Sequence, residues 1–322
     1  MSKAAKVWLI IAGSLVALGV LIFVGALAIS GWDLSNFGIS KYTTQTYEIG
    51  DSFDTIVINV PASDIEFAPA NDGKCRIDCF DLPETQYSAE VRDDALTVTT
   101  YGEKTTWIDR LSAFSCEGPK MTVYLPESVS KQLKIAASAG DVRLPADFTF
   151  DGVDIDSSTS DVDCAASVTE EMKIHSTTGD IRLSALSAGK IHIDVTTGDV
   201  QMQNVTAQGD VTVKTTTGDI TLTETFSEKS FSLEGVTCDI RFDKCDAAQI
   251  AAHTTTGDIT GTLCSDKNFT AKSNVGDVKV PDNGEGGNCE LTTGTGNILI
   301  TIVEGELPKS TADSTAQEQP AA

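Results

Sequence analysis

The stretch from Thr177 to Val200 reads TTGDIRLSALSAGKIHIDVTTGDV, and it opens and closes on the same short phrase. In this phrase two small or polar residues precede a Gly, an Asp and a β-branched residue. The Asp or Asn of the phrase stands at 64 and, after one interruption, at 141, 161, 180, 199, 219, 239, 258, 277 and 297. From 141 onward the spacing is always 19 or 20 residues, which is typical of repeat architectures in which every unit has the same structure.

Apolar residues occupy fixed positions relative to this Asp in every unit. The side chains eight and six residues before it, and one and three residues after it, are nearly always apolar, whereas the residues between them are mostly polar. This alternation predicts two short, half-buried strands that meet at a sharp Gly-Asp corner. A unit this short cannot bury its apolar face alone, so we expect each unit to coil onto the next at about 4.8 Å. The sequence therefore predicts an all-β fold, a β-solenoid of about ten coils of 19–20 residues.

The interruption between Ala68 and Lys131 has a different pattern. Four runs in it read as strands, at 74–80, 86–91, 95–101 and 120–125, and Arg92-Asp93-Asp94 is expected to form a hairpin turn. We interpret 68–131 as an irregular β insertion that covers the open edge at the start of the solenoid. The predicted solenoid domain spans 47–302, and the polar residues 303–322 after it are expected to form a disordered tail.

An apolar segment precedes the domain. Residues 7–29 are uncharged and mostly apolar, and as a helix they would extend about 34 Å, enough to cross a bilayer core of about 30 Å. Lys3 and Lys6 lie on the short side, so the positive-inside rule places residues 1–6 in the cytoplasm and makes 7–29 a transmembrane signal anchor. A cleaved signal peptide is the alternative, because Ala26-Leu27-Ala28 fits a small-x-small cleavage site.

Both interpretations export the same domain. With an uncleaved anchor, the chain is a single-pass protein of the cell membrane with an extracytoplasmic C-terminal domain, and residues 30–46 are a spacer between the membrane and that domain. The N-terminal helix is then the contact with the membrane.

The composition limits the possible partners. The chain has 23 Lys and Arg against 47 Asp and Glu, a formal net charge of −24 at pH 7. This balance argues against nucleic acid, whose phosphates require a basic surface, so charged partners are expected to be cationic. Eight Cys without a Cys-x-x-Cys pair, and only three His, argue against a zinc site, and no cofactor is expected.

The TTGDI and TTGDV phrases, together with Asp-Ile-Glu-Phe at 64–67 and Met-Thr-Val-Tyr-Leu-Pro at 121–126, resemble the bacterial β-strand-repeat "putative adhesin" domains, a family of unknown function. The resemblance covers about residues 47–303. It implies a domain of the bacterial cell envelope that often follows a membrane anchor and is associated with envelope stress responses. It implies no catalytic or ligand-binding residues.

The recurring Asp is the first candidate for chemistry. Stacked coils bring neighbouring carboxylates to about 4.8 Å, where two unit charges repel by roughly 0.9 kcal/mol in water. In one hypothesis each Asp accepts hydrogen bonds from backbone N–H groups of its own turn, with counter-charge from Arg143, Arg182, Arg241 and Lys279. In the alternative, a row of Ca²⁺ ions lies between the carboxylates of Asp141, Asp161, Asp180, Asp199, Asp219, Asp239, Asp258 and Asp277.

Two cysteines are the second candidate. Cys245 and Cys264 both lie six residues after their Asp in adjacent units, so their Cα atoms are expected about 4.8 Å apart, within the range of a disulfide. A reduced pair would pack equally well, and both possibilities stay open. His175, His192 and His253 fall on outward columns, where we interpret them as solvated polar residues without a catalytic role.

Three functions are compatible with these features. The first is a cell-surface, adhesin-like module that binds an envelope polymer or protein along the polar flanks of the solenoid. The second is an envelope-stress sensor or a decoy for cationic peptides, which the acidic surface would attract. The third, a β-helix polysaccharide-cleaving enzyme, is disfavoured because units of nearly constant length leave no loops to enclose a cleft. We predict a binding module and not an enzyme.

Overall fold

The computed structural model describes residues 13–21, 24–25, 28, 43–81, 85–101, 118–126 and 131–303. Residues 13–21, 24–25 and 28 are helical and belong to one unit of the chain, whereas nearly all the β-strands belong to a second unit. Within the described residues, no helix combines the length and the apolar character needed to cross a membrane. The rest of the expected span 7–29, nearly all of the spacer and all but the first residue of the expected tail 303–322 lie outside the described residues.

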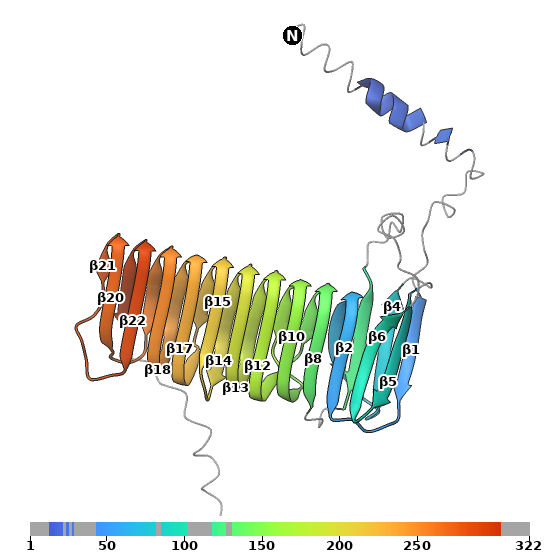
Figure 1. Cartoon of the computed structure of the whole chain (residues 1–322), viewed down its shortest axis with the longest axis horizontal. Helices are drawn as coiled ribbons and strands as arrows, with labels where there is room; N and C mark the ends of the chain where they lie inside the picture. Colours follow the sequence, from blue (N-terminus) through green and yellow to red (C-terminus); the bar gives the residue numbers. More distant parts are fainter. Residues whose placement is uncertain are drawn as a thin grey trace, which may run out of the picture. The chain divides into compact units, whose positions relative to one another are not determined.

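The strands of the β unit agree with the predicted solenoid and its insertion (Figure 1). The first group is β1 (Thr43–Ile49), β2 (Thr55–Ala62), β3 (Asp64–Pro69), β4 (Cys75–Asp81), β5 (Gln86–Arg92), β6 (Ala95–Tyr101) and β7 (Lys120–Leu125). The second group is β8 (Gln132–Ala139), β9 (Val142–Leu144), β10 (Thr149–Thr159), β11 (Val162–Cys164), β12 (Ser167–Thr178), β13 (Ile181–Thr197), β14 (Val200–Ala207), β15 (Val211–Thr217), β16 (Ile220–Thr223), β17 (Phe226–Thr237), β18 (Ile240–Thr256), β19 (Ile259–Leu263), β20 (Asn268–Val275), β21 (Val278–Lys279), β22 (Asn288–Thr295) and β23 (Ile298–Ile302).

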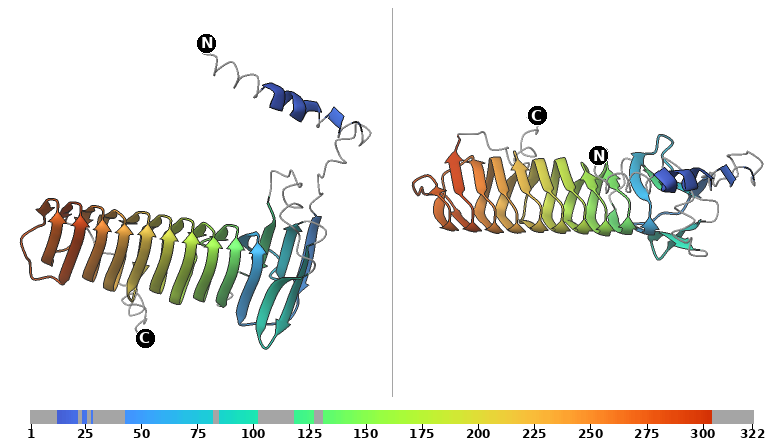
Figure 2. Two further views of the ribbon diagram at one scale, coloured as in Figure 1. Left: turned by 45° about the horizontal axis from the view of Figure 1, so that its top comes forward. Right: turned by 90° about the horizontal axis from the view of Figure 1, so that it is seen from above.

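The stacked coils pair in parallel and in the register that the repeat predicts (Figure 2). Ile155 lies opposite Ile174, and Ile174 lies opposite Ile193. The columns therefore join into one continuous core whose side chains are almost completely buried. Burial of each large apolar side chain contributes roughly 1.5–3 kcal/mol, so this interior is the main source of stability.

Four consecutive coils, from that of Asp180 to that of Asp239, also contain a third stretch of inward-pointing side chains that the sequence pattern did not reveal. Six residues after the Asp, buried side chains again point into the core, namely Leu186, Val205, Thr225 and Cys245. The residue just before each of them has a left-handed backbone, with φ of 52° at Ala185, 55° at Asn204, 45° at Glu224 and 52° at Lys244. These four residues share no chemical character, so the sequence gave no sign of a conserved corner there.

The insertion covers one end of the solenoid, as predicted. β6 pairs in parallel with β2, and β7 pairs in parallel with β3, so together they add a coil in front of β2 and β3. β5 and β4 then pair antiparallel with β6 and β7, and β1 pairs with β4. The predicted hairpin turn is confirmed by Asp93 and Asp94, whose φ values are 50° and 59°.

At the opposite end the order of the coils in space differs from their order in the sequence. We expected each unit to stack on the one before it, but β22 pairs with β18 and β23 pairs with β19. The unit of Asn297 therefore lies on the unit of Asp258, and β20 and β21, which flank Asp277, form the outermost coil (Figure 1). A spacing of 19–20 residues is compatible with either order, so the repeat alone could not reveal the exchange.

A glycine-rich connection makes this return possible. Residues 281–287 run from the outermost coil back to β22, and Gly284 N–H donates a hydrogen bond to the Lys267 carbonyl at 3.0 Å. A Cβ on Gly286 would lie 1.7 Å from the Asp266 carbonyl oxygen, so a side chain is excluded at this crossing. Beneath the connection, Lys267 Nζ and Asp246 Oδ1 form a buried ion pair at 2.6 Å.

A deletion of one coil tests the solenoid register. Removal of Asp199–Gly218 joins Gly198 to Asp219 and restores every column, so we expect a shorter chain with a single cooperative thermal transition and an unchanged strand signal in circular dichroism. Removal of the ten residues Asp199–Gln208 shifts the columns out of phase and is expected to abolish that transition. Equal tolerance or equal loss in the two variants would contradict the register.

Candidate functional site

The Asp of each Gly-Asp corner holds two neighbouring coils together. Asp180 Oδ1 accepts a hydrogen bond from Asp199 N–H at 2.9 Å, and Asp199 Oδ1 accepts one from Asp219 N–H at 2.8 Å. The same bond joins Asp64 to Asp141 and then recurs from coil to coil as far as Asp258. We expected each carboxylate to cap its own turn. Instead, the N–H group that donates a hydrogen bond to it belongs to the next coil in the stack.

The series continues in spatial order where the sequence order changes. Asn297 N–H donates to Asp258 Oδ1 at 2.7 Å, and Asp277 N–H donates to Asn297 Oδ1 at 3.0 Å. An amide oxygen thus replaces a carboxylate oxygen in the same geometry. The acceptor atom, and not the charge, is what the corner requires.

Arginines two residues after the Asp offset part of the carboxylate charge. Arg241 binds Asp219 Oδ2 at 2.8 Å and Asp239 Oδ2 at 2.6 Å, so it bridges two coils. Arg182 likewise binds the Oδ2 atom of the corner carboxylate Asp180, at 2.8 Å. The predicted role of these arginines as counter-charge is confirmed. Lys279, the fourth predicted counter-charge, stays a prediction.

The calcium row stays a prediction. Among the described residues, no group of three or more His, Cys, Asp or Glu side chains has the geometry to hold a metal ion. One oxygen of each corner carboxylate from Asp141 to Asp258 already accepts a hydrogen bond from a backbone N–H group, and the second oxygen of Asp141, Asp180, Asp219 and Asp239 contacts an arginine.

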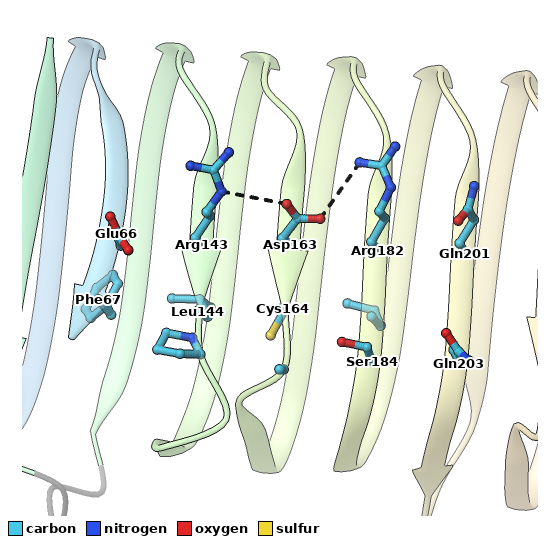
Figure 3. Close-up of a pocket in the computed structure, with 13 residues that line it drawn as sticks. Glu66, Phe67, Arg143, Leu144, Asp163, Cys164, Arg182, Ser184, Gln201 and Gln203 are labelled. Atoms are coloured by element: carbon cyan, nitrogen blue, oxygen red, sulfur yellow. Dashed lines mark ion pairs between the residues drawn. The ribbon is translucent and has the colours of Figure 1, made fainter. Parts of the chain in front are cut away.

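A groove lies on the face formed by β3, the short strands β9 and β11, and the first residues of β13 and β14, and we call it the short-strand groove (Figure 3). Its volume is about 450 Å³, and the half-buried Pro145 and Ala165 form its apolar floor above the buried core residues Leu144, Cys164 and Leu183. The coil in the middle carries Cys164 and Ala165 where its neighbours carry Leu144-Pro145 and Leu183-Ser184. Because the middle side chains are smaller, the surface is hollowed there.

Charged side chains of alternating sign line the groove. Glu66, Arg143, Asp163 and Arg182 follow one another on adjacent strands, and Gln201 comes next. Asp163 lies between the two arginines, with Arg143 Nε and Arg182 Nη1 each 3.8 Å from one of its oxygens (Figure 3). At that distance the contacts are ion pairs without direct hydrogen bonds, so the Asp163 oxygens keep the capacity to accept hydrogen bonds from a ligand.

The lining of the short-strand groove has two carboxylates and two guanidinium groups, and corner carboxylates next to the arginines add further negative charge. Arg143 also contacts Asp141 at 3.4 Å, and Arg182 also contacts Asp161 at 3.9 Å and Asp180 at 2.8 Å. Sequence analysis missed the groove because it depends on the sizes of side chains in three separate units. The alternation of charge two residues after the Asp was the one available signal.

Cys245 and Cys264 are free thiols in the structure, and they do not lie directly opposite each other. The left-handed residue Lys244 introduces a register shift, so Cys245 pairs with Leu263. Burial raises the pKa of Cys245 to about 12, and burial also raises the pKa of Cys264. The choice between a reduced pair and a disulfide stays a prediction.

The three histidines occupy the outward positions that the repeat predicts. His175 lies opposite Asp156 and Asp194 on the neighbouring strands, with its Nδ1 3.9 Å from Asp194 Oδ2. His192 and His253 lie opposite Lys173 and Glu234. Their assignment as solvated polar residues stays a prediction.

One known family of proteins matches this chain in sequence. The sequence profile described as Toastrack DUF4097 matches residues 53–263 and 208–316, which together cover most of the chain. No curated protein matches the chain.

Several solved structures are similar to this chain, and the one with a TM-score of 0.50 supports the fold. A crystal structure of a "putative adhesin" from Parabacteroides distasonis ATCC 8503 is 14% identical, with a TM-score of 0.50 over 82% of this chain and 98% of that one. A "putative adhesin" from Bacteroides fragilis NCTC 9343 is 17% identical, with a TM-score of 0.48 over 81% of this chain and 97% of that one. A "putative lipid binding protein" from Parabacteroides distasonis is 12% identical, with a TM-score of 0.40 over 80% of this chain and 97% of that one.

Two substitutions of Asp199 separate the role of its oxygen from that of its charge. Asp199→Ala leaves Asp219 N–H without an acceptor and is expected to cost about 1–3 kcal/mol of unfolding free energy, seen as a fall of several degrees in melting temperature. Asp199→Asn keeps the acceptor, as Asn297 does, and is expected to melt close to the wild type. If Asn destabilises as much as Ala, the charge is needed and the cation row is favoured.

Thiol labelling decides between the two states of Cys245 and Cys264. With a pKa of about 12, only about one Cys245 in 10⁴ is a thiolate at pH 8, so labelling of the folded protein is expected to be very slow. After denaturation without reductant, both peptides are expected to carry the label. The buried Cys164, which we predict to be a column filler, is the control. Labelling of Cys164 but not of Cys245 and Cys264 until reductant is added would establish the bridge.

Proposed function

The chain belongs to the Toastrack DUF4097 family, and we propose that it is a membrane-anchored, extracytoplasmic binding module that holds a cationic segment of an envelope partner in the short-strand groove. The observation that carries this proposal is the position of Asp163 beside an apolar floor, in a groove whose arginines are flanked by the corner carboxylates. The Asp163 side chain has no hydrogen bond among the described residues, and it lies between Arg143 and Arg182 at the centre of the rim (Figure 3).

A basic partner with some apolar surface suits this groove. Its cationic groups would compete with Arg143 and Arg182 for Asp163, and its apolar groups would pack on the half-buried Pro145 and Ala165. The long 3.8 Å contacts of Asp163 are weaker than the 2.8 Å contact of Arg182 with Asp180, so Asp163 is the carboxylate that changes partner most easily.

The acidic surface around the groove also favours a positively charged partner. Between residues 131 and 303 the sequence has 26 Asp and Glu against 13 Lys and Arg, and the carboxylates of the corners run along the whole stack. Such a field attracts cations over a distance of about one Debye length, near 10 Å at 0.1 M salt. Long-range attraction would bring the partner to the surface, and the short-strand groove would then hold it.

The location belongs to the proposal. The uncharged segment 7–29 with Lys3 and Lys6 before it supports an N-terminal anchor, and the "putative adhesin" structure with the same fold supports display at the cell surface. A sensor or decoy for cationic peptides would use the same groove, and differs only in the signal that follows binding. A polysaccharide-cleaving enzyme is disfavoured, because the groove arises from two small side chains and no loop encloses it among the described residues.

Binding of a cationic amphipathic peptide of Lys and Leu to the full chain in detergent tests the proposal. We expect affinity to fall steeply between about 0.1 M and 1 M salt, where the Debye length falls from about 10 Å to about 3 Å. Asp163→Asn is expected to weaken binding at low salt by about two- to fivefold, the size of one exposed charge pair.

Asp154→Asn is the matched control, because it removes one exposed carboxylate from β10 and leaves the short-strand groove intact. It is expected to change the affinity by less than the change at Asp163. An affinity that is indifferent to salt would contradict a charge-based partner. Equal effects of the two substitutions would show that the general field, and not the groove, binds the peptide.

A further inference from the structure

The outermost coil leaves the end of the core uncovered. One residue after the Asp, the side chains of the inner coils are 0–1% exposed, whereas Val278 at the same position in the outermost coil is 41% exposed. Val275 is 64% exposed at a position where the inner coils carry exposed threonines, so it adds an apolar side chain to the surface beside this end. The apolar column therefore ends at the surface of the molecule, at an end where no further strand lies beyond β20 and β21 within the part of the chain that the structure describes.

The other end of the solenoid shows how such an edge is closed. There β4 and β5 pair antiparallel with the last parallel strands, and their inward side chains Ile77, Cys79 and Tyr87 are buried. No strand of this kind pairs with β20, which has β22 as its one partner among the described strands. The two ends are therefore unequal, and one of them is an unpaired strand edge.

The edge of β20 is closed at its first residues and open afterwards. Phe269 N–H donates a hydrogen bond to Asn283 Oδ1 at 2.7 Å, so the returning connection covers the beginning of the strand. The rest of β20, from Ala271 to Val275, has no such cover among the described residues. This segment offers backbone donors and acceptors to a strand from outside.

The composition of the chain indicates which strand could pair with this open edge of β20. Residues 304–322 contain Leu307 as their one large apolar residue, so they lack the side chains to extend the core columns. A second copy of the protein presents Val275, Val278 and an open β20 edge on a single surface. In a two-fold arrangement each copy supplies the same surface, and two edges pair antiparallel, which is the only pairing that a two-fold axis between them allows.

Charge also permits two copies to meet here. Most of the molecule would repel a second copy, because the net charge of the chain is −24. The outermost coil, from 268 to 280, carries Lys272 and Lys279 against Asp277. The repulsion between two acidic rods is therefore smallest at this end.

We propose that the solenoid forms a two-fold dimer end to end, in which the β20 edges of two copies pair antiparallel over Ala271–Val275 and the exposed Val275 and Val278 are covered. The sheet of one copy, which is parallel within that copy, then continues through the antiparallel β20 pair into the sheet of the other copy. The contact is the narrow end of a rod, so it belongs to the small class of interfaces, below about 1,200 Å², that associate weakly. We expect dissociation constants in the micromolar range.

Sedimentation equilibrium of the full chain in density-matched detergent, from about 1 to 100 µM protein, tests this dimer. The wild type is expected to shift from monomer to dimer over that range. Val278→Asp places a buried carboxylate on each side of the contact and is expected to raise the dissociation constant at least tenfold. Val236→Asp is the matched control, because Val236 is 48% exposed on an inner coil, and it is expected to leave the constant unchanged within twofold.

A second substitution guards against loss of folding in the outermost coil. Val275→Asp alters a side chain that is already 64% exposed, so the melting temperature is expected to stay near that of the wild type while dimerisation weakens. A wild type that stays monomeric up to 100 µM would overturn the proposal. Association that neither Val275→Asp nor Val278→Asp weakens would also overturn it, because the contact would then lie elsewhere, for example in residues 7–29.

Discussion

The hydrogen bond from each corner N–H to the carboxylate of the previous coil determines much of this structure. The chain turns sharply at the Gly-Asp corner, and at the seven corners that have glycine the carbonyl of the neighbouring coil leaves no space for a side chain, whereas Ser63, Ser160 and Cys238 occupy this position at the other three. A Cβ on Gly198 would lie 2.0 Å from the Gly179 carbonyl oxygen, at a φ of 151°. Only glycine fits this contact without strain. The Asp that follows then fixes the distance between coils, because its oxygen must reach the next N–H group. The repeated phrase thus encodes both the turn and the stacking distance.

This way of joining coils has an electrostatic consequence that connects stability with the proposed binding. Each coil adds a carboxylate to the same edge, and Asn297 shows that the hydrogen bond itself does not need the charge. Where Arg182 and Arg241 bridge successive carboxylates, the repulsion is offset locally. The remaining carboxylates keep a negative field along the stack. Asp163, which is not part of any corner, adds to that field at the short-strand groove, where it is free to exchange partners.

The sequence predicted the features that repeat in chemical character. The Ile and Val columns, the Gly-Asp corner, the hairpin at Asp93 and the cap formed by the insertion could all be inferred, because each depends on residues of one kind at one spacing. The third stretch of inward-pointing side chains in four coils could not, because the left-handed corner accepts Ala, Asn, Glu or Lys. The inner hydroxyl groups were also missed. Thr254 and Thr293 are buried and donate to the carbonyls of Cys238 and Gly257 at 2.9 Å, so polar residues occupy positions where alternation predicts apolar ones.

The exchange of the last two coils follows from the same regularity that makes the fold predictable. Every coil presents the same edge, with an N–H group at the corner and apolar columns behind it, so the coil of Asn297 and the coil of Asp277 would both fit on the coil of Asp258. The choice between them depends on features outside the repeat. The longer connection 281–287 can cross the end of the stack, and its Asn283 satisfies Phe269 N–H only when β20 is outermost. The β22 edge, by contrast, receives a full parallel partner on each side. The order of coils is therefore set by the irregular residues at the end, and those same residues leave part of β20 unpaired.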